Sequence, residues 1–223
     1  MESHRRTSED FMDELEGLVA VGGDLQPGTL LSAYRQGIFP WPMEGGPLPW
    51  FSPLRRAILD FKNLHLSRSL ARDWKRVMRD ATYRFTLNTA FGEVIRNCAN
   101  APRPGQDGTW ITDDVIQGYC ALHREGHAFS IEAWEGTALV GGLYGVNIDG
   151  AVAAESMFHR QTNVSKFCIL YLIEVLKQRG LDWIDIQVMT PHMEALGAKL
   201  IPRRQFLARL AETRKRGLRP LSE

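Results

Sequence analysis

Three consecutive segments determine the architecture of this chain: AFSIEAWEGTALVGGLYGVNIDGAVAAESMF (128–158), NVSKFCILYLIEVLKQR (163–179) and WIDIQV (183–188). The first holds three runs rich in β-formers, separated by Glu135-Gly136 and Asp149-Gly150, which are typical of hairpin turns. The second places apolar residues on one broad face at helical spacing, and the third alternates as a strand does. An antiparallel meander followed by a helix and a further strand predicts an α+β fold.

The flanking segments extend this order. From about residue 83 we expect β, α, α, β, β, β, α, β, α, β, with a last helix after them. The ranges are 83–87, 89–99, 112–125, 128–134, 138–146, 151–158, 163–179, 183–188, 191–196, 200–201 and 204–216. This order is expected of GNAT-like acyltransferase domains, although an analogy of fold alone says little about function.

The region before residue 63 has a different composition. A short helix is expected over 27–36 and a strand over 56–61. Between them, IFPWPMEGGPLPWFSPLR (38–55) has five prolines interleaved with aromatic residues. Because proline lacks a backbone donor, we expect an irregular, stiff loop whose aromatic side chains pack together or line a site. The difference in composition sets 1–62 apart from 63–223, and the family resemblance given below implies a small N-terminal α/β domain (1–62) and a GNAT-like catalytic domain (63–223).

The composition excludes several classes of protein. With 223 residues, 44% hydrophobic and 24% charged, the chain is neither wholly disordered nor a coiled coil. No apolar run reaches the roughly 20 residues that cross a bilayer, and the first residues are too polar for a signal peptide. Three cysteines without a CxxC argue against a disulfide scaffold, so we expect a cytoplasmic protein.

Positive charge is clustered in this sequence. The formal net charge is only +1, so a polyanion would have to be bound by local groups of basic residues. A helix expected after Ser67 carries one such group on a single stripe: Arg68, Arg72, Lys75, Arg76 and Arg79. A second group lies within 203–219. One stripe alone is more often a solvated helix face, but two groups favour contacts with a phosphate backbone.

Two polar residues stand in a strand expected at the centre of the sheet. Asp185 and Gln187 are two apart in WIDIQV, so their side chains should share one face. They could be a structural hydrogen-bonded pair. Alternatively, the carboxylate accepts or positions an amine proton and the amide orients it. Glu155 begins the ESMF segment at the end of another predicted strand, and the helix that starts at Asn163 offers free N–H groups.

Blocks in order along nearly the whole chain resemble bacterial leucyl/phenylalanyl-tRNA–protein transferases. They are VGGDLQPGTLLSAYRQGIFPW (21–41), WFSPLRR (50–56), LHLSRSL (64–70), TAFGEVIRNCA (89–99), GTWITDDVIQGYCALHREGHAFSIEAW (108–134), LVGGLYGV (139–146), ESMF…NVSK (155–166), IDIQ (184–187) and LGAKLIPRRQF (196–206). The GIFPW and TWIT blocks are the hardest to obtain by chance.

The resemblance implies a reaction. Enzymes of this family move Leu, Phe or sometimes Met from aminoacyl-tRNA to the α-amine of proteins that begin with Arg or Lys. The product is a signal for the N-degron (N-end rule) degradation pathway. The donor is the aminoacyl ester, so no acyl-CoA, ATP or metal cofactor is implied. We expect a cytoplasmic monomer that does not contact a membrane.

The resemblance also implies roles for individual residues. The catalytic residues fall on Asp185 and Gln187, and the tRNA-binding helix falls on the stripe from Arg68 to Arg79. The aminoacyl-adenosine pocket falls on Trp50, Trp110, Leu143, Glu155, Ser156, Ile169, Leu172 and Leu176. The acceptor's basic side chain also needs a carboxylate near the cleft, and the candidates, Asp185, Glu132 and Glu155, stay open.

Two other classes of function remain open. A GNAT enzyme that acetylates an amine from acetyl-CoA would need a Gly-rich pyrophosphate loop before the long helix, and MFHRQTNVSK (157–166) is a poor substitute. A non-catalytic RNA-binding module would not need Asp185 and Gln187 on one strand face, and its binding would survive their loss.

Overall fold

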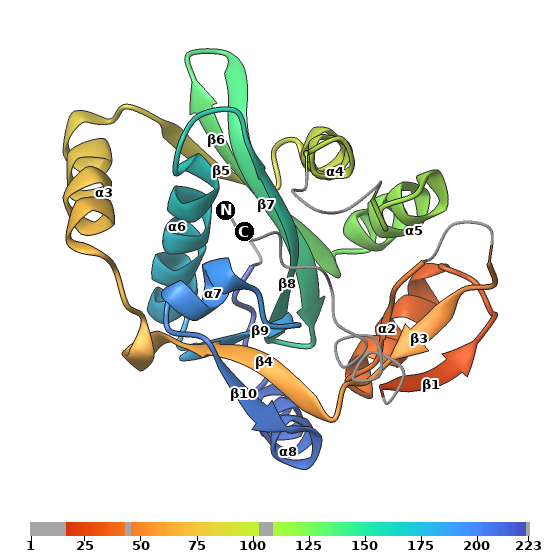
Figure 1. The fold of residues 1–223 in the computed structure, drawn as a ribbon. Coiled ribbons are helices and arrows are strands. Elements are labelled where there is room, and N and C mark those ends of the chain that lie inside the picture. Colours follow the sequence, from red (N-terminus) through yellow and green to blue (C-terminus); the bar gives the residue numbers. More distant parts are fainter. Residues whose placement is uncertain (1–16, 43–45, 103–108, 222–223) are drawn as a thin grey trace, which may run out of the picture.

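A seven-stranded sheet forms the centre of the molecule in the computed structural model, which describes residues 17–42, 46–102 and 109–221 (Figure 1). The strand order is β10-β4-β9-β8-β7-β6-β5, and β8 and β9 form the parallel pair. The strands are β4 (Arg55–Asp60), β5 (Arg84–Leu87), β6 (Ala128–Glu135), β7 (Ala138–Ile148), β8 (Ala151–His159), β9 (Trp183–Gln187) and β10 (Lys199–Pro202).

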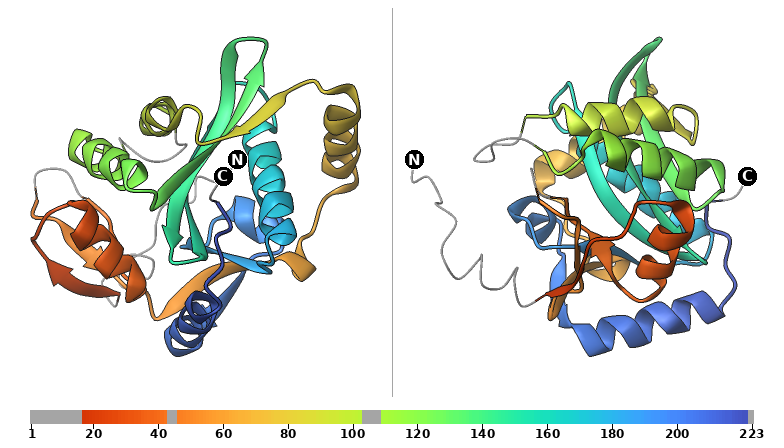
Figure 2. Two further views of the ribbon diagram at one scale, coloured as in Figure 1. Left: turned by 180° about the vertical axis from the view of Figure 1, so that it is seen from behind. Right: turned by 90° about the vertical axis from the view of Figure 1, so that its right-hand side faces the viewer.

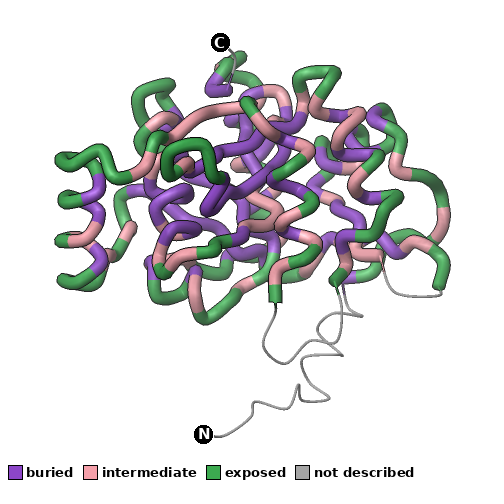
Figure 3. The backbone as a smooth tube through the Cα atoms, turned by 90° about the horizontal axis from the view of Figure 1, so that it is seen from above, coloured by how far each residue is buried: buried purple, intermediate pink, exposed green. Residues whose placement is uncertain are grey.

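Helices cover both faces of this sheet (Figures 1 and 2). On one face lies α6 (Val164–Gln178), with α3 (Arg68–Asp80) packed outside it. On the other face lie α4 (Phe91–Ala99) and α5 (Asp113–Arg124). The last two are α7 (Pro191–Ala195) and α8 (Arg203–Lys215), which follow β9 and β10. Each face has its own apolar core, and buried residues run through the middle of the molecule (Figure 3).

The N-terminal region forms a second, smaller sheet. Its strands are β1 (Leu18–Val21), β2 (Phe39–Pro40) and β3 (Pro49–Phe51), in the order β1-β3-β2, with α2 (Pro27–Arg35) between β1 and β2. The prediction of an irregular loop over 38–55 was therefore wrong where β2 and β3 form. Proline still accepts through its carbonyl, and the Trp41 N–H donates to the Pro49 carbonyl at 3.1 Å.

The rest of the predicted order is confirmed. From β5 to β10 the elements follow the expected sequence, and the fold class is α+β. Local signals set several helix ends, as at Ser67 and Thr112, whose hydroxyls accept from the N–H groups of Leu70 and Val115. No helix within the described ranges is long and apolar enough to cross a membrane.

The domain division at residue 62 stays a prediction. The strand just before that boundary, β4, lies between β10 and β9 in the large sheet. Residues of α2 and β2 also belong to the same apolar core as α4 and α5. The N-terminal region is thus packed directly against the larger one, beside the central strands that carry the polar residues.

Candidate active site

The polar residues gather where β8 and β9 separate. These parallel strands share one bridge pair, Ala153 with Asp185. Tyr144 of β7 lies opposite Ser156 and Gly145 lies opposite Ala154, so Glu155 is the extra residue of a β-bulge. Gly145 makes this geometry possible, because a side chain there would collide with the carbonyl of Ala153. The bulge aims Glu155 and Ser156 into the same cavity.

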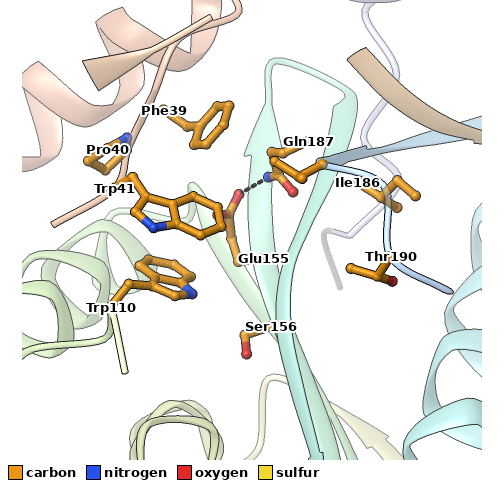
Figure 4. A pocket seen from close by; sticks show the side chains of 10 residues that line it. Phe39, Pro40, Trp41, Trp110, Glu155, Ser156, Ile186, Gln187 and Thr190 are labelled. Carbon is orange, nitrogen blue, oxygen red and sulfur yellow. Dashed lines mark hydrogen bonds between the residues drawn. The ribbon is translucent and has the colours of Figure 1, made fainter. Parts of the chain in front are cut away.

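That cavity is small, about 230 Å³, and mostly aromatic on the side of the N-terminal region (Figure 4). The indoles of Trp41 and Trp110 stack, with ring centroids 5.8 Å apart and planes at 24°. Glu155 and Gln187 face each other beside this pair. The lining residues are Phe39, Pro40, Trp41, Trp110, Glu155, Ser156, Ile186, Gln187, Val188 and Thr190.

Asp185 lies behind the cavity, in a buried ion pair with Arg56. Arg56 donates through Nε to Oδ1 at 2.8 Å and through Nη2 to Oδ2 at 2.7 Å, and the two side chains are 1% and 2% exposed. The guanidinium lies 4.6 Å from the ring centroids of both Phe39 and Phe206. Both carboxylate oxygens are therefore occupied by a cation that packing holds in place.

Gln187 is linked to Asp185 through its backbone. Its N–H donates to Asp185 Oδ1 at 2.9 Å, and its φ is +57°, in the left-handed region. Strand β9 ends there, so the strand predicted to reach Val188 is shorter. Because of this turn, the Gln187 side chain lines the cavity while that of Asp185 points to Arg56. The carboxylate of Asp185 thus holds the backbone of Gln187 in a conformation that costs energy.

Glu155 is the carboxylate that lines the cavity. Gln187 Nε2 donates to Glu155 Oε1 at 2.5 Å, and the hydroxyl of Tyr34 also hydrogen-bonds to Glu155. Tyr34 is held in turn by Tyr119, with 2.6 Å between the hydroxyl oxygens. Burial raises the pKa of Glu155 to about 8; the charge of Asp185 adds to the rise, whereas the hydrogen bond from Tyr34 opposes it.

The structure brings only some of the predicted pocket residues together. Trp110, Glu155 and Ser156 line the cavity. Trp50 lies elsewhere, in β3, and its indole donates to the Gly22 carbonyl at 2.8 Å. Four apolar residues predicted for the pocket are buried in the core under α6 and do not line this cavity: Leu143, Ile169, Leu172 and Leu176.

Trp41 is one of several cavity-lining residues that the sequence-based prediction missed. It belongs to the GIFPW block and lies nine positions before Trp50 in the same Pro/aromatic segment. Both tryptophans match the pattern of an aromatic-lined site. The pairing of β3 with β1 and β2 decides between them, because it places Trp50 against α2 and leaves Trp41 beside Trp110. A signal existed in the motif, but the choice depends on strand pairing.

Glu132 cannot read an acceptor side chain from its position in the fold. It is fully buried in β6, where it accepts from Ser130 Oγ and Thr86 Oγ1, both at 2.5 Å. It also accepts from the backbone N–H groups of Thr89 and Ala90 at the start of α4. The oxygens of this carboxylate are thus satisfied by donors inside the fold. Within the described ranges, no three His, Cys, Asp or Glu side chains lie close enough to hold a metal ion.

The predicted basic stripe is a continuous surface on α3. Its buried side is anchored by Trp74, which stacks on Phe167 with centroids 5.8 Å apart. Its outer side has a shallow hollow of about 600 Å³, lined by Arg68, Ala71, Arg72, Lys75, Arg76 and Arg79. The second basic group, within 203–219, is different, because several of its arginines form ion pairs with carboxylates of the same chain. Arg209 pairs with Asp60, and Arg214 pairs with Asp149.

Comparison with known proteins agrees with this arrangement. The family model for leucyl/phenylalanyl-tRNA protein transferase matches residues 58–211, and the model for its N-terminal domain matches 23–54. A leucyl/phenylalanyl-tRNA–protein transferase of Shewanella sp. (strain W3-18-1) is 48% identical over 204 residues, 92% of this chain and 84% of that protein. The protein of the same name from Citrobacter koseri is 49% identical over 210 residues, 94% of this chain and 87% of that protein.

Solved structures are more distant. A ribosomal-protein-alanine N-acetyltransferase from Brucella melitensis has a TM-score of 0.29 and 17% identity, over 44% of this chain and 74% of that one. An aminoglycoside N-acetyltransferase has a TM-score of 0.33 and 16% identity, over 57% and 87%. These weak likenesses say nothing about activity. The family models and the close relatives do, and they show that the chain belongs to the leucyl/phenylalanyl-tRNA–protein transferases, a family of aminoacyltransferases.

Proposed function

We propose that this enzyme transfers Leu, Phe or Met from aminoacyl-tRNA to the N-terminal α-amine of proteins that begin with Arg or Lys. The transfer would mark those proteins for degradation by the N-degron pathway. The observation that carries the proposal is the cavity itself, in which stacked tryptophans lie beside a buried amide and a half-buried carboxyl. Such a site can hold a nucleoside next to groups that donate or accept protons.

The donor's terminal adenosine is assigned to Trp41 and Trp110. Stacking of a base on an aromatic side chain contributes about 1–3 kcal/mol and accepts any π-face. The family resemblance assigns the aminoacyl side chain to Leu143, Ile169 and the neighbouring leucines of α6. In the structure these side chains are buried in the core next to the cavity. An apolar pocket distinguishes single methylenes by only about 1–3 kcal/mol, so Met should be a secondary donor.

Gln187 and Asp185 are assigned to alignment. The aminoacyl ester is already activated, so the enzyme has to place the amine against the ester carbonyl and manage one proton. Alignment is potentially the larger gain, up to about 7–11 kcal/mol. The Gln187 side chain lies in the cavity, where it can orient the amine. Asp185, paired with Arg56, acts as the electrostatic support of Gln187.

The α3 stripe is assigned to the tRNA backbone. Its five basic side chains face solvent on the helix side opposite Trp74, where phosphates can approach. Asp73 neutralises part of this charge, because Arg76 lies 3.4 Å and Arg72 lies 3.8 Å from its carboxylate. Binding should therefore be salt-dependent and largely independent of sequence. We place the reaction in the cytoplasm and expect a monomer.

A single-turnover assay tests the proposal. Radiolabelled Leu-tRNA is mixed with a peptide that begins with Arg, and a parallel reaction contains acetyl-CoA instead. We expect labelled peptide from the tRNA donor only, and less product from peptides that begin with Ala or Glu. Acetylation from acetyl-CoA without transfer from tRNA would contradict the proposal, as would salt-sensitive tRNA binding with no product from either donor.

A further inference from the structure

The two carboxylates at the centre of the site have opposite surroundings. Asp185 is matched by the guanidinium of Arg56 on both oxygens and lies outside the cavity wall. Glu155 lines the cavity, and its hydrogen-bond partners there, Gln187 and Tyr34, are both neutral. Among the residues that the structure describes, no cation forms an ion pair with Glu155. A carboxylate with a bound cation is a poor proton acceptor, whereas one held by neutral donors can gain and lose a proton.

We propose that Glu155 is the proton carrier of the transfer reaction, with Tyr34 and Tyr119 as the residues that position it. This inference rests on the proposed function, because it assigns a step of that reaction. It differs from the family-based assignment, which puts the catalytic carboxylate at Asp185. It also separates the roles: Gln187 aligns the amine, and Glu155 exchanges the proton.

The step balances without a cofactor. The neutral α-amine of the acceptor attacks the ester carbonyl, and the new C–N bond forms as the nitrogen loses one proton to the carboxylate of Glu155. The ester C–O bond to the terminal ribose then breaks. Glu155 returns its proton to the leaving ribose oxygen and is ionised again. One amine and one ester are consumed, and one amide and one ribose hydroxyl are produced.

The groups around Glu155 support both halves of this cycle. Tyr34 of α2, Tyr119 of α5, Asp185 of β9 and Arg56 of β4 all influence its charge. Burial dominates and brings the pKa of Glu155 to about 8, near the pKa of about 7.7–8.0 of a peptide α-amine. A carrier whose affinity for the proton matches that of the attacking group can accept it and release it again.

The tyrosine pair fixes where this carboxylate lies. Both rings are fully buried and meet edge to face, with centroids 6.5 Å apart. Burial raises the pKa of each phenol well above its ordinary value, so both stay protonated and act as donors. Tyr34 can then donate to Glu155 while its own oxygen stays within hydrogen-bond distance of Tyr119.

The test is the pH dependence of transfer by the full-length enzyme. With Leu-tRNA saturating, log(kcat/KM) for an Arg-peptide is measured from about pH 5.5 to 9. Below the pKa of both groups, the wild type must lose one proton from the amine and one from Glu155. We expect a slope of about two for the wild type and about one for Glu155→Gln, whose rate at pH 8 should fall roughly 10²–10⁴-fold. Tyr34→Phe should keep the slope of about two. The pH at which log(kcat/KM) levels off should rise by about one unit, because Glu155 loses a hydrogen bond that favours its charged form.

Controls separate this role from other causes. Glu212→Gln, an exposed carboxylate on α8, should behave as the wild type. Circular dichroism and the Kd for Leu-tRNA show that each variant is folded and binds its donor. A slope of about two in Glu155→Gln, whether its Kd is normal or weakened, would overturn the assignment and leave Glu155 a binding residue. Absence of transfer by the wild type itself would instead overturn the proposed function.

Discussion

The buried pair of Arg56 and Asp185 gives the sharpest prediction about stability. Arg56→Met keeps an unbranched, apolar stem but leaves Asp185 without its cation in a site where both groups are almost fully enclosed. Removing one partner of such a pair costs about 3–5 kcal/mol, because the remaining charge is buried and uncompensated. A domain of this size has a total stability of about 5–15 kcal/mol. The midpoint of thermal unfolding should therefore fall by roughly 10 °C.

Urea unfolding followed by far-UV circular dichroism measures this cost. The matched control is the double variant Arg56→Met/Asp185→Leu, in which both charges are replaced by apolar groups. We expect it to recover most of the loss, because neither charge remains buried alone. If Arg56→Met costs less than about 1 kcal/mol, or if the losses of Arg56→Met and of Asp185→Leu alone simply add in the double variant, the ion pair does not stabilise the fold.

The ion pair of Arg56 and Asp185 also complicates kinetic measurements on Asp185 variants, because stability and rate change together. Asp185→Asn removes the charge that Arg56 needs, so it should lose stability as well as rate. Activity must therefore be measured at a temperature where the variant is folded. We then expect a lower kcat with a nearly unchanged Kd for aminoacyl-tRNA, since the change alters the support of Gln187 and leaves the tryptophan pair intact. Equal activity in the folded variant would contradict any role for Asp185.

Three further changes test the pocket, the fold and the basic surface. Trp41→Ala should weaken binding of aminoacyl-tRNA roughly ten-fold or more in a filter-binding assay. Trp50→Ala should leave that Kd unchanged in the folded protein but lower the free energy of unfolding in urea by about 3–5 kcal/mol. The reverse pattern would refute the placement of Trp41, and not Trp50, in the pocket. Hydrogen bonds from Arg35 of α2 are the main cause that lowers the pKa of Asp149 to about 2. Its ion pairs should thus stabilise the fold above about pH 4 and lose their effect as the pH falls towards 2. Asp149→Asn should therefore cost about 1–2 kcal/mol at pH 7, and urea unfolding should show that difference vanish in acid. Arg72→Ala should reduce the slope of log Kd against log salt for tRNA by about one, while Lys215→Ala on α8 should not change it.

Local chemistry explains why much of the fold was predictable. The hydroxyl of Thr112 and the strand and helix periodicities act within a few residues, and they set the element order from β5 to β10. Arg56 and Asp185 are 129 positions apart, and no short-range pattern links them. Likewise, the choice between Trp41 and Trp50 depends on how a short sheet pairs. The sequence therefore predicts which residue types form the site, whereas long-range pairing decides which of them face the cavity.

The N-terminal region contributes side chains to the cavity as well as to the core. Tyr34 reaches Glu155 from α2, and Trp41 completes the aromatic wall with Trp110. Phe39 covers the guanidinium of Arg56, and the Gly37 carbonyl accepts from its Nη1 at 3.3 Å. These contacts converge on the point where β8 and β9 separate. Without them the bulge would still present a carboxyl, but the aromatic wall opposite it would lose Phe39 and Trp41. The small N-terminal sheet therefore supplies one wall of the cavity that the β8 bulge opens in the large sheet.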